Sequence, residues 1–146
     1  MAEEPIVNTT LLAVTSVAED CASLSSILRP PFWNLRWMRT LGEARIALHT
    51  ALIGAVISEV SFVDGHGWRD LLREIQDMAD PPPLIVAGCE GNESLWAEVL
   101  NLGGWDLLMK PFDSKEVLQV LRMACRVREF EQRKAPQRKL ATACGM

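Results

Sequence analysis

Short hydrophobic runs alternate with amphipathic segments along almost the whole chain. The apolar runs at residues 10–15, 52–58, 84–87 and 105–109 have the length and composition of buried strands. Residues 35–38 alternate apolar and polar side chains, as a less buried edge strand does. Each predicted strand is followed by a segment with apolar residues at helical spacing. Five such units predict an α/β fold, with helices on both faces of an open parallel sheet.

Capping residues mark where several of the predicted helices begin. Ser16, with Glu19 three residues later, forms a capping-box pattern, and so does Asp113 with Glu116. Asn92 is a further candidate N-cap. Proline and glycine pairs close the helices at their other ends. The helices are therefore expected at about residues 17–28, 43–50, 68–79, 92–102 and 113–132.

The run from Leu52 to Ser58 predicts the strand at the centre of the sheet. It is almost wholly apolar and rich in β-branched residues, as in a strand buried on both faces. Open α/β sheets bind ligands at the carboxyl ends of their strands. The end of this strand, at Glu59, is therefore the natural place for a functional site.

Length and composition limit the possible classes of protein. The 146 residues suffice for one domain, expected over residues 1–132, with a flexible tail at 133–146. The formal charge of −4 argues against a nucleic-acid partner, which would require a strongly basic surface. The four cysteines show no CxxC spacing, and no apolar run is long enough to cross a membrane. These features predict a cytoplasmic protein with reduced thiols.

Two segments carry a resemblance to a known family. The stretch 57–67 places Glu59 at a strand end and Gly67 eight residues later, and Lys110-Pro111 follows the last predicted strand. This pattern resembles the receiver domains of bacterial response regulators over roughly residues 8–130. The resemblance implies a flavodoxin-like, doubly wound sheet of five parallel strands in the order 2-1-3-4-5. It also implies a cis peptide bond between Lys110 and Pro111.

In that family, an acidic pair after the first strand and a phosphorylatable aspartate hold a magnesium ion. The resemblance places Thr15 and Ser16 at the acidic pair and Glu59 at the phosphoacceptor. Hydroxyl side chains cannot replace two carboxylates as magnesium ligands. The extra methylene of Glu59 moves its carboxylate outward by about 1 to 1.5 Å, which disturbs an in-line attack. No cofactor is therefore expected, and Mg²⁺ binding is expected to be weak or absent.

The remaining positions of the receiver signalling set are also altered. By resemblance, Gly88 stands where a hydroxyl residue contacts the phosphoryl group, and Leu107 stands where an aromatic residue switches. Lys110 is retained, and we expect it to pair directly with Glu59. Glu59 is then either the remnant of an inactive site or a permanent mimic of a phosphorylated aspartate.

Other site chemistries have little support in the sequence. His49 and His66 have no partner at metal-ligand spacing, so no metal site is expected. The glycines around His66 lack the spacing of a nucleotide-binding loop. Ser58, Ser61 and Cys89 have no nucleophile motif around them. No catalytic residue and no enzymatic turnover are therefore predicted.

A protein-binding surface is the remaining candidate for function. Trp96 and Leu100 lie beside the inward stripe of the fourth helix, and Trp105 starts the last strand. In receivers, the fourth helix, last strand and last helix form the usual output or dimer face. Exposed tryptophans there would be good interface anchors. The expected partner is a kinase, an output domain or another signalling protein, and a homodimer is an alternative.

These observations favour an atypical receiver of a two-component or phosphorelay pathway that binds protein without phosphorylation. One alternative is a receiver that still accepts phosphate, or that is active because Glu59 mimics the phosphorylated state. An alternative of another class is a small flavodoxin-like enzyme or ligand-binding protein. A third is the receiver part of a longer regulator, since the last helix runs into a charged segment.

Overall fold

The computed structural model describes residues 9–89 and 93–127. Its centre is a sheet of five parallel strands in the order β2-β1-β3-β4-β5, which confirms the predicted flavodoxin-like fold. The predicted edge strand indeed lies at one edge, and the predicted central strand indeed lies in the middle. The strands are β1 (Thr9–Val14), β2 (Trp33–Met38), β3 (Ala55–Glu59), β4 (Leu84–Cys89) and β5 (Asp106–Lys110).

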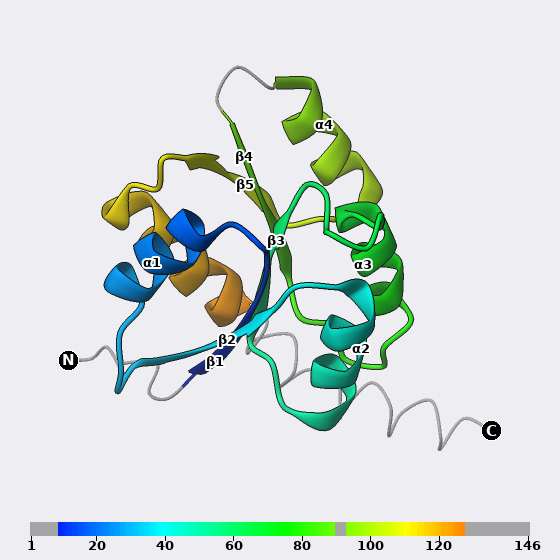
Figure 1. Cartoon of the computed structure of the whole chain (residues 1–146), viewed down its shortest axis with the longest axis horizontal. Coiled ribbons are helices and arrows are strands. Elements are labelled where there is room, and N and C mark those ends of the chain that lie inside the picture. The colour runs from blue at the N-terminus through cyan, green and yellow to red at the C-terminus, as the bar shows by residue number, and fades with distance from the viewer. Residues whose placement is uncertain (1–8, 90–92, 128–146) are drawn as a thin grey trace.

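Helices cover both faces of the sheet (Figure 1). One face carries α2 (Leu41–Thr50), α3 (Trp68–Gln76) and α4 (Glu93–Leu102). The other carries α1 (Ala18–Ile27) and the C-terminal helix, which is described over residues 114–127. Successive strand residues point to opposite faces, so each central strand feeds two separate apolar cores. In β1, for example, Leu12 packs under α2 and α3, whereas Leu11 packs under α1.

Three details of the sequence interpretation are wrong. The central strand starts at Ala55 rather than Leu52, which is 87% exposed in the connection from α2. Ser16 is not an N-cap, because α1 starts later, with Val17 at the N-cap and no side-chain cap bond. The helix expected at residues 68–79 ends at Gln76, so Ala79 lies beyond its end and is exposed.

Two other local predictions are confirmed. The Asp113 carboxylate accepts a hydrogen bond from the Glu116 backbone N–H at 3.0 Å, so it caps the C-terminal helix. The Lys110-Pro111 peptide bond is cis, as the resemblance implied. Asn92 as an N-cap, the extension of the last helix to residue 132 and the tail at 133–146 lie outside the described residues. Within the described part, no helix is both long enough and apolar enough to span a membrane.

Candidate functional site

The carboxyl ends of β1, β3 and β5 bring three predicted residues to one edge of the sheet. Thr15 follows β1, while Glu59 ends β3 and Lys110 ends β5. The Glu59 carboxylate accepts a hydrogen bond from Thr15 Oγ1 at 2.8 Å and one from the Ser16 backbone N–H at 3.4 Å. Its other oxygen lies 3.6 Å from Lys110 Nζ, so the predicted ion pair is present. Ser16 thus contributes its backbone rather than its hydroxyl.

Asp20 is the site residue that the sequence interpretation missed. It lies in the first turn of α1, and its carboxylate is 2.5 Å from Lys110 Nζ, closer than that of Glu59. All three side chains are largely buried, with 14% of Asp20, 16% of Glu59 and 20% of Lys110 exposed. A usable signal existed, because Asp20 precedes the buried Leu24 by four residues and therefore shares its helix face.

The two carboxylates set the charge state of Lys110. Burial alone would lower the pKa of Lys110, but the hydrogen bond with Asp20 and the charges of Asp20 and Glu59 raise it above 10.5. Lys110 is therefore a stable cation at neutral pH. The site holds one ammonium between two carboxylates, and both carboxylates are counter-ions of the Lys110 ammonium within the same chain.

A side chain at Gly88, near the end of β4, would require the Leu95 side chain to shift. A Cβ at this position would lie 2.9 Å from Leu95 Cδ2 and 3.5 Å from Leu107 Cδ1. Leu107 is itself buried in the core under α2, α3 and α4. Two packed leucines therefore occupy the region where the resemblance expects a hydroxyl and a mobile aromatic ring.

The space beside the ion pairs is small. Thr15, Asp20, Glu59 and Phe112 help to line a cavity of about 10 Å³. This volume holds about one water molecule. Among residues 9–89 and 93–127, no group of three or more histidine, cysteine, aspartate or glutamate residues is arranged to hold a metal ion.

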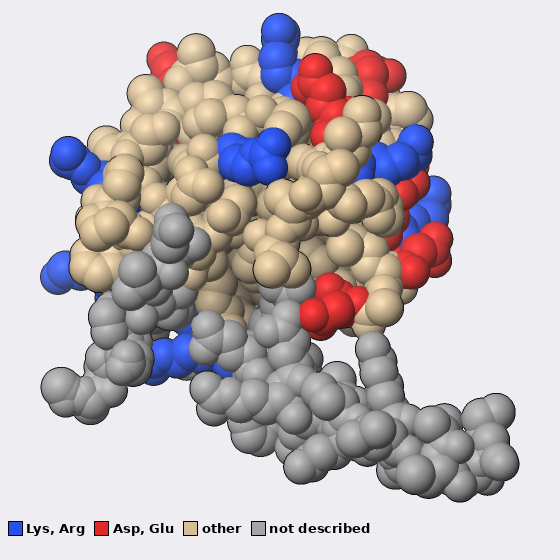
Figure 2. Space-filling model, turned by 90° about the horizontal axis from the view of Figure 1, so that it is seen from below, with Lys and Arg blue, Asp and Glu red and all other residues tan. Residues whose placement is uncertain are grey.

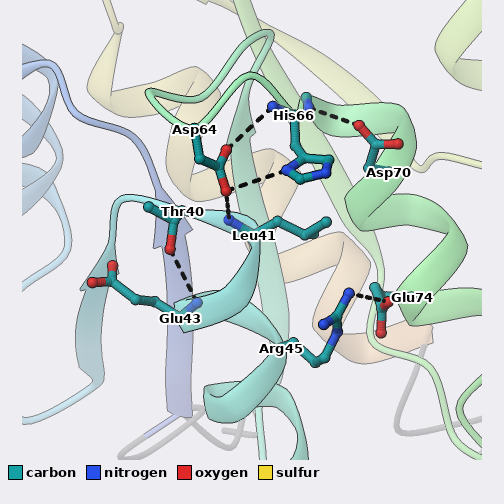
Figure 3. Close-up of polar contacts among 9 residues, drawn as sticks. Thr40, Leu41, Glu43, Arg45, Asp64, His66, Asp70 and Glu74 are labelled. Carbon is teal, nitrogen blue, oxygen red and sulfur yellow. Dashed lines mark hydrogen bonds and ion pairs between the residues drawn. The ribbon is translucent and has the colours of Figure 1, made fainter.

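The loop after Glu59 is fixed to the start of α2 (Figure 3). Asp64 accepts hydrogen bonds from the backbone N–H of Leu41 at 3.1 Å and of His66 at 3.2 Å, and it pairs with His66 Nδ1 at 3.3 Å. Gly65 makes the turn with a φ of +90°, which favours glycine. The glycine-rich stretch is therefore a tight structural turn.

Asp64→Ala is expected to lower stability in a pH-dependent way. Burial alone would raise the pKa of Asp64, but its hydrogen bonds to His66 and Leu41 hold the pKa below the usual 3.8. A lowered carboxyl pKa stabilises the fold above about pH 3.8 and loses that effect as the pH falls through the lowered value. Urea unfolding at several pH values measures the difference. Asp64→Asn, which keeps an acceptor oxygen without a charge, is the matched control; an equal loss at every pH would contradict this account.

The predicted partner face is only partly one surface. On α4, Trp96 is 48% and Leu100 39% exposed, and Trp96 Nε1 donates to the Asp106 carboxylate at 3.3 Å. Trp105 is half-buried and packs against the core on the opposite face of the sheet, under α1 and the C-terminal helix. Trp96 and Leu100 are therefore the available anchors.

Charged side chains are dispersed over the surface seen in Figure 2. Lysine and arginine side chains there are separated by uncharged surface or lie beside acidic ones. Three arginine ion pairs on the described surface illustrate this mixing: Arg45 with Glu74, Arg69 with Glu98 and Arg73 with Asp70. Among the described residues on this face, there is no broad basic area of the kind that phosphate backbones require.

Comparison with known proteins supports the same fold. No family model matches the chain. It is 31% identical to the regulatory protein VirG of Rhizobium radiobacter over 81 residues and 31% identical to VirG of Agrobacterium fabrum over 74 residues. These matches cover 56% and 51% of this chain but only 30% and 29% of the two relatives.

Solved receiver structures superimpose on most of the chain. The signal receiver domain of an HD domain-containing protein from Pseudomonas fluorescens has a TM-score of 0.75 at 23% identity, covering 91% of this chain and 97% of that one. The N-terminal receiver domain of a two-component response regulator from Bacteroides fragilis gives 0.71 at 16%, covering 80% and 96%. NtrX from Brucella abortus gives 0.78 at 18%, covering 89% of this chain and 29% of NtrX.

The sheet order and these similarities confirm the resemblance: the chain has the fold of a response-regulator receiver domain.

Proposed function

We propose that this domain is an atypical receiver in a two-component or phosphorelay pathway and binds a protein partner without a phosphorylation cycle. The observation that supports this most strongly is the internal pairing of Lys110, whose ammonium is bound by Asp20 and Glu59 of the same chain. A phosphoryl group at the sheet edge would need that cation. In this domain the charge of the Lys110 ammonium is already neutralised by Asp20 and Glu59.

The chemistry of phosphoryl transfer is poorly supported at this site. Transfer to a carboxylate needs a cation, usually magnesium, to offset charge on the transferring group. Thr15 and Ser16 supply no carboxylate, and Thr15 donates its hydroxyl hydrogen bond to Glu59. The other oxygen of the Glu59 carboxylate pairs with Lys110, so both oxygens have a partner within the domain. We therefore propose that the domain has no catalytic residue and no metal or other cofactor.

The cavity size also bears on the flavodoxin-like alternative. At the carboxyl edge of β1 and β3, the space is about 10 Å³, far below the several hundred Å³ of a typical small-molecule pocket. A flavin or a substrate of similar size does not fit this cavity. This edge therefore favours a signalling domain over a small ligand-binding enzyme.

The proposed binding surface is α4 with the adjoining part of β5. Exposed aromatic and aliphatic side chains at Trp96 and Leu100 suit a protein interface. Leu107 is buried and has no ring to rotate, so binding there is constitutive in this proposal. The partner is a kinase, an output domain or a related signalling protein, or a second copy of the chain. Because the relatives are much longer, the domain can also be part of a larger regulator.

A second form of the function treats Glu59 as a permanent mimic of a phosphorylated aspartate. It is favoured by the contacts of Glu59, which has a hydroxyl donor and an ammonium nearby. Glu59→Gln separates the two forms, because it removes the charge with little change in shape. In an inactive remnant, amide NMR shifts are expected to change only around Thr15 and Lys110. Changes that extend to Trp96 and Leu100, absent from a Glu19→Gln control that alters an exposed acid of α1, would support the mimic instead.

A further inference from the structure

We infer that Asp20 is the residue that closes this site to phosphate, so that restoring the missing acidic residues alone does not restore phosphorylation. The inference rests on the proposed function and goes beyond it. It adds a second block, at a specific side chain of α1, to the altered positions Thr15, Ser16 and Glu59.

Asp20 blocks the site first through charge. A phosphoryl group carries about −1.5 to −2 charges at neutral pH, and Lys110 is the cation at this edge. The Asp20 carboxylate lies 2.5 Å from Lys110 Nζ, within the range of a charge-assisted hydrogen bond. An incoming phosphoryl group must therefore break this pair and then lie beside an uncompensated carboxylate.

Asp20 also blocks the site through space. Its side chain lines the same 10 Å³ cavity as Thr15 and Glu59, so it takes up room next to the acceptor position. It cannot swing away with its helix, because Leu24, one turn later on the same face, is 1% exposed in the core. Moving α1 would expose that leucine to solvent.

The block makes a specific prediction for redesigned variants. The triple variant Thr15→Asp/Ser16→Asp/Glu59→Asp restores the three family carboxylates but adds negative charge around Asp20. It is expected to remain unmodified by acetyl phosphate and Mg²⁺. Adding Asp20→Ala frees Lys110 and the space beside it. In the step expected then, a carboxylate oxygen at position 59 forms a bond to phosphorus, and the bond from phosphorus to the acetyl oxygen breaks to release acetate.

Intact-protein mass spectrometry tests the inference in the full chain. We expect one added phosphoryl group on the quadruple variant and none on the triple variant. A triple variant carrying Glu19→Ala is the matched control, since it removes a neighbouring exposed acid of α1. Phosphorylation of the triple variant would overturn the role of Asp20 while leaving the proposed function intact. A quadruple variant that is folded but unmodified would also overturn the role of Asp20. Modification of the wild type would instead overturn the proposed function.

A single substitution keeps the inference testable if the multiple variants do not fold. Asp20→Ala alone is expected to bind inorganic phosphate at least about tenfold more tightly than the wild type. A phosphate titration followed through the NMR signals of Lys110 measures the two affinities. Asp20→Asn, which keeps the side-chain volume but removes the charge, shows how much of the effect is electrostatic. Equal phosphate affinity in the wild type and Asp20→Ala would contradict the inference.

Discussion

Replacing Trp68 with alanine is expected to lower the free energy of unfolding by about 3–5 kcal/mol. Trp68 begins α3 directly after the loop that follows Glu59, and only 2% of it is exposed. Its side chain packs in the core under α2, α3 and α4. Removing it leaves a cavity that the surrounding residues fill only in part. This loss is a large share of the roughly 5–15 kcal/mol that stabilise a typical domain.

Chemical denaturation of the wild type and of Trp68→Ala measures this loss in the free energy of unfolding. Trp96→Ala is the matched control, because it removes the same side chain from a position that is 48% exposed. The control is expected to cost much less, on the order of 1 kcal/mol. Similar losses for the two variants would contradict the described packing of α3.

Replacing Lys110 with methionine is expected to lower the free energy of unfolding by about 2 kcal/mol. The substitution leaves the carboxylates of Asp20 and Glu59 close together and largely buried without their cation. Losing one partner of a fully buried pair costs about 3–5 kcal/mol, whereas an exposed pair is worth about 1 kcal/mol or less. The partial exposure of these side chains places the expected loss between those limits. Lys115→Met removes the same charge from an exposed position of the C-terminal helix and is the control.

The stability difference between the wild type and Lys110→Met is expected to depend on pH with a defined sign. Because the pKa of Lys110 is raised above 10.5, its contribution is fully present below about pH 10.5 and is lost as the pH rises through the raised value. The difference in stability between the wild type and Lys110→Met should therefore persist from neutral pH to about pH 10. A difference that disappears well below pH 10 would show that the pair is not formed in solution.

The fold could be predicted from the sequence because its apolar pattern is strong and regular. The run that contains Val56 and Ile57 is apolar on both faces, which only a central strand requires. The predicted start of that strand is wrong, because an apolar residue such as Leu52 fits a strand pattern equally well when it lies in an exposed connection. Hydrophobic pattern therefore predicts which segments form the core better than it predicts where they begin.

The site could be predicted only where a strand end fixes the residue. Glu59 and Lys110 follow directly from the ends of β3 and β5, and their pairing was expected. Asp20 reaches the site from a helix. Its spacing from Leu24 places it on the buried face of α1, but that spacing alone does not show that this face lies beside the ends of β3 and β5. The filling of the space at Gly88 by Leu95 and Leu107 depends on packing between distant segments, which local pattern does not reveal.

The most direct measurement is the intact mass of the wild-type protein after incubation with acetyl phosphate and Mg²⁺. We expect the mass to remain unchanged, because Lys110 is neutralised by Asp20 and Glu59 and the site lacks the acidic pair. Stoichiometric addition of one phosphoryl group, located at Glu59 by fragmentation, would contradict the proposal and show that the domain is a working phosphorylation switch.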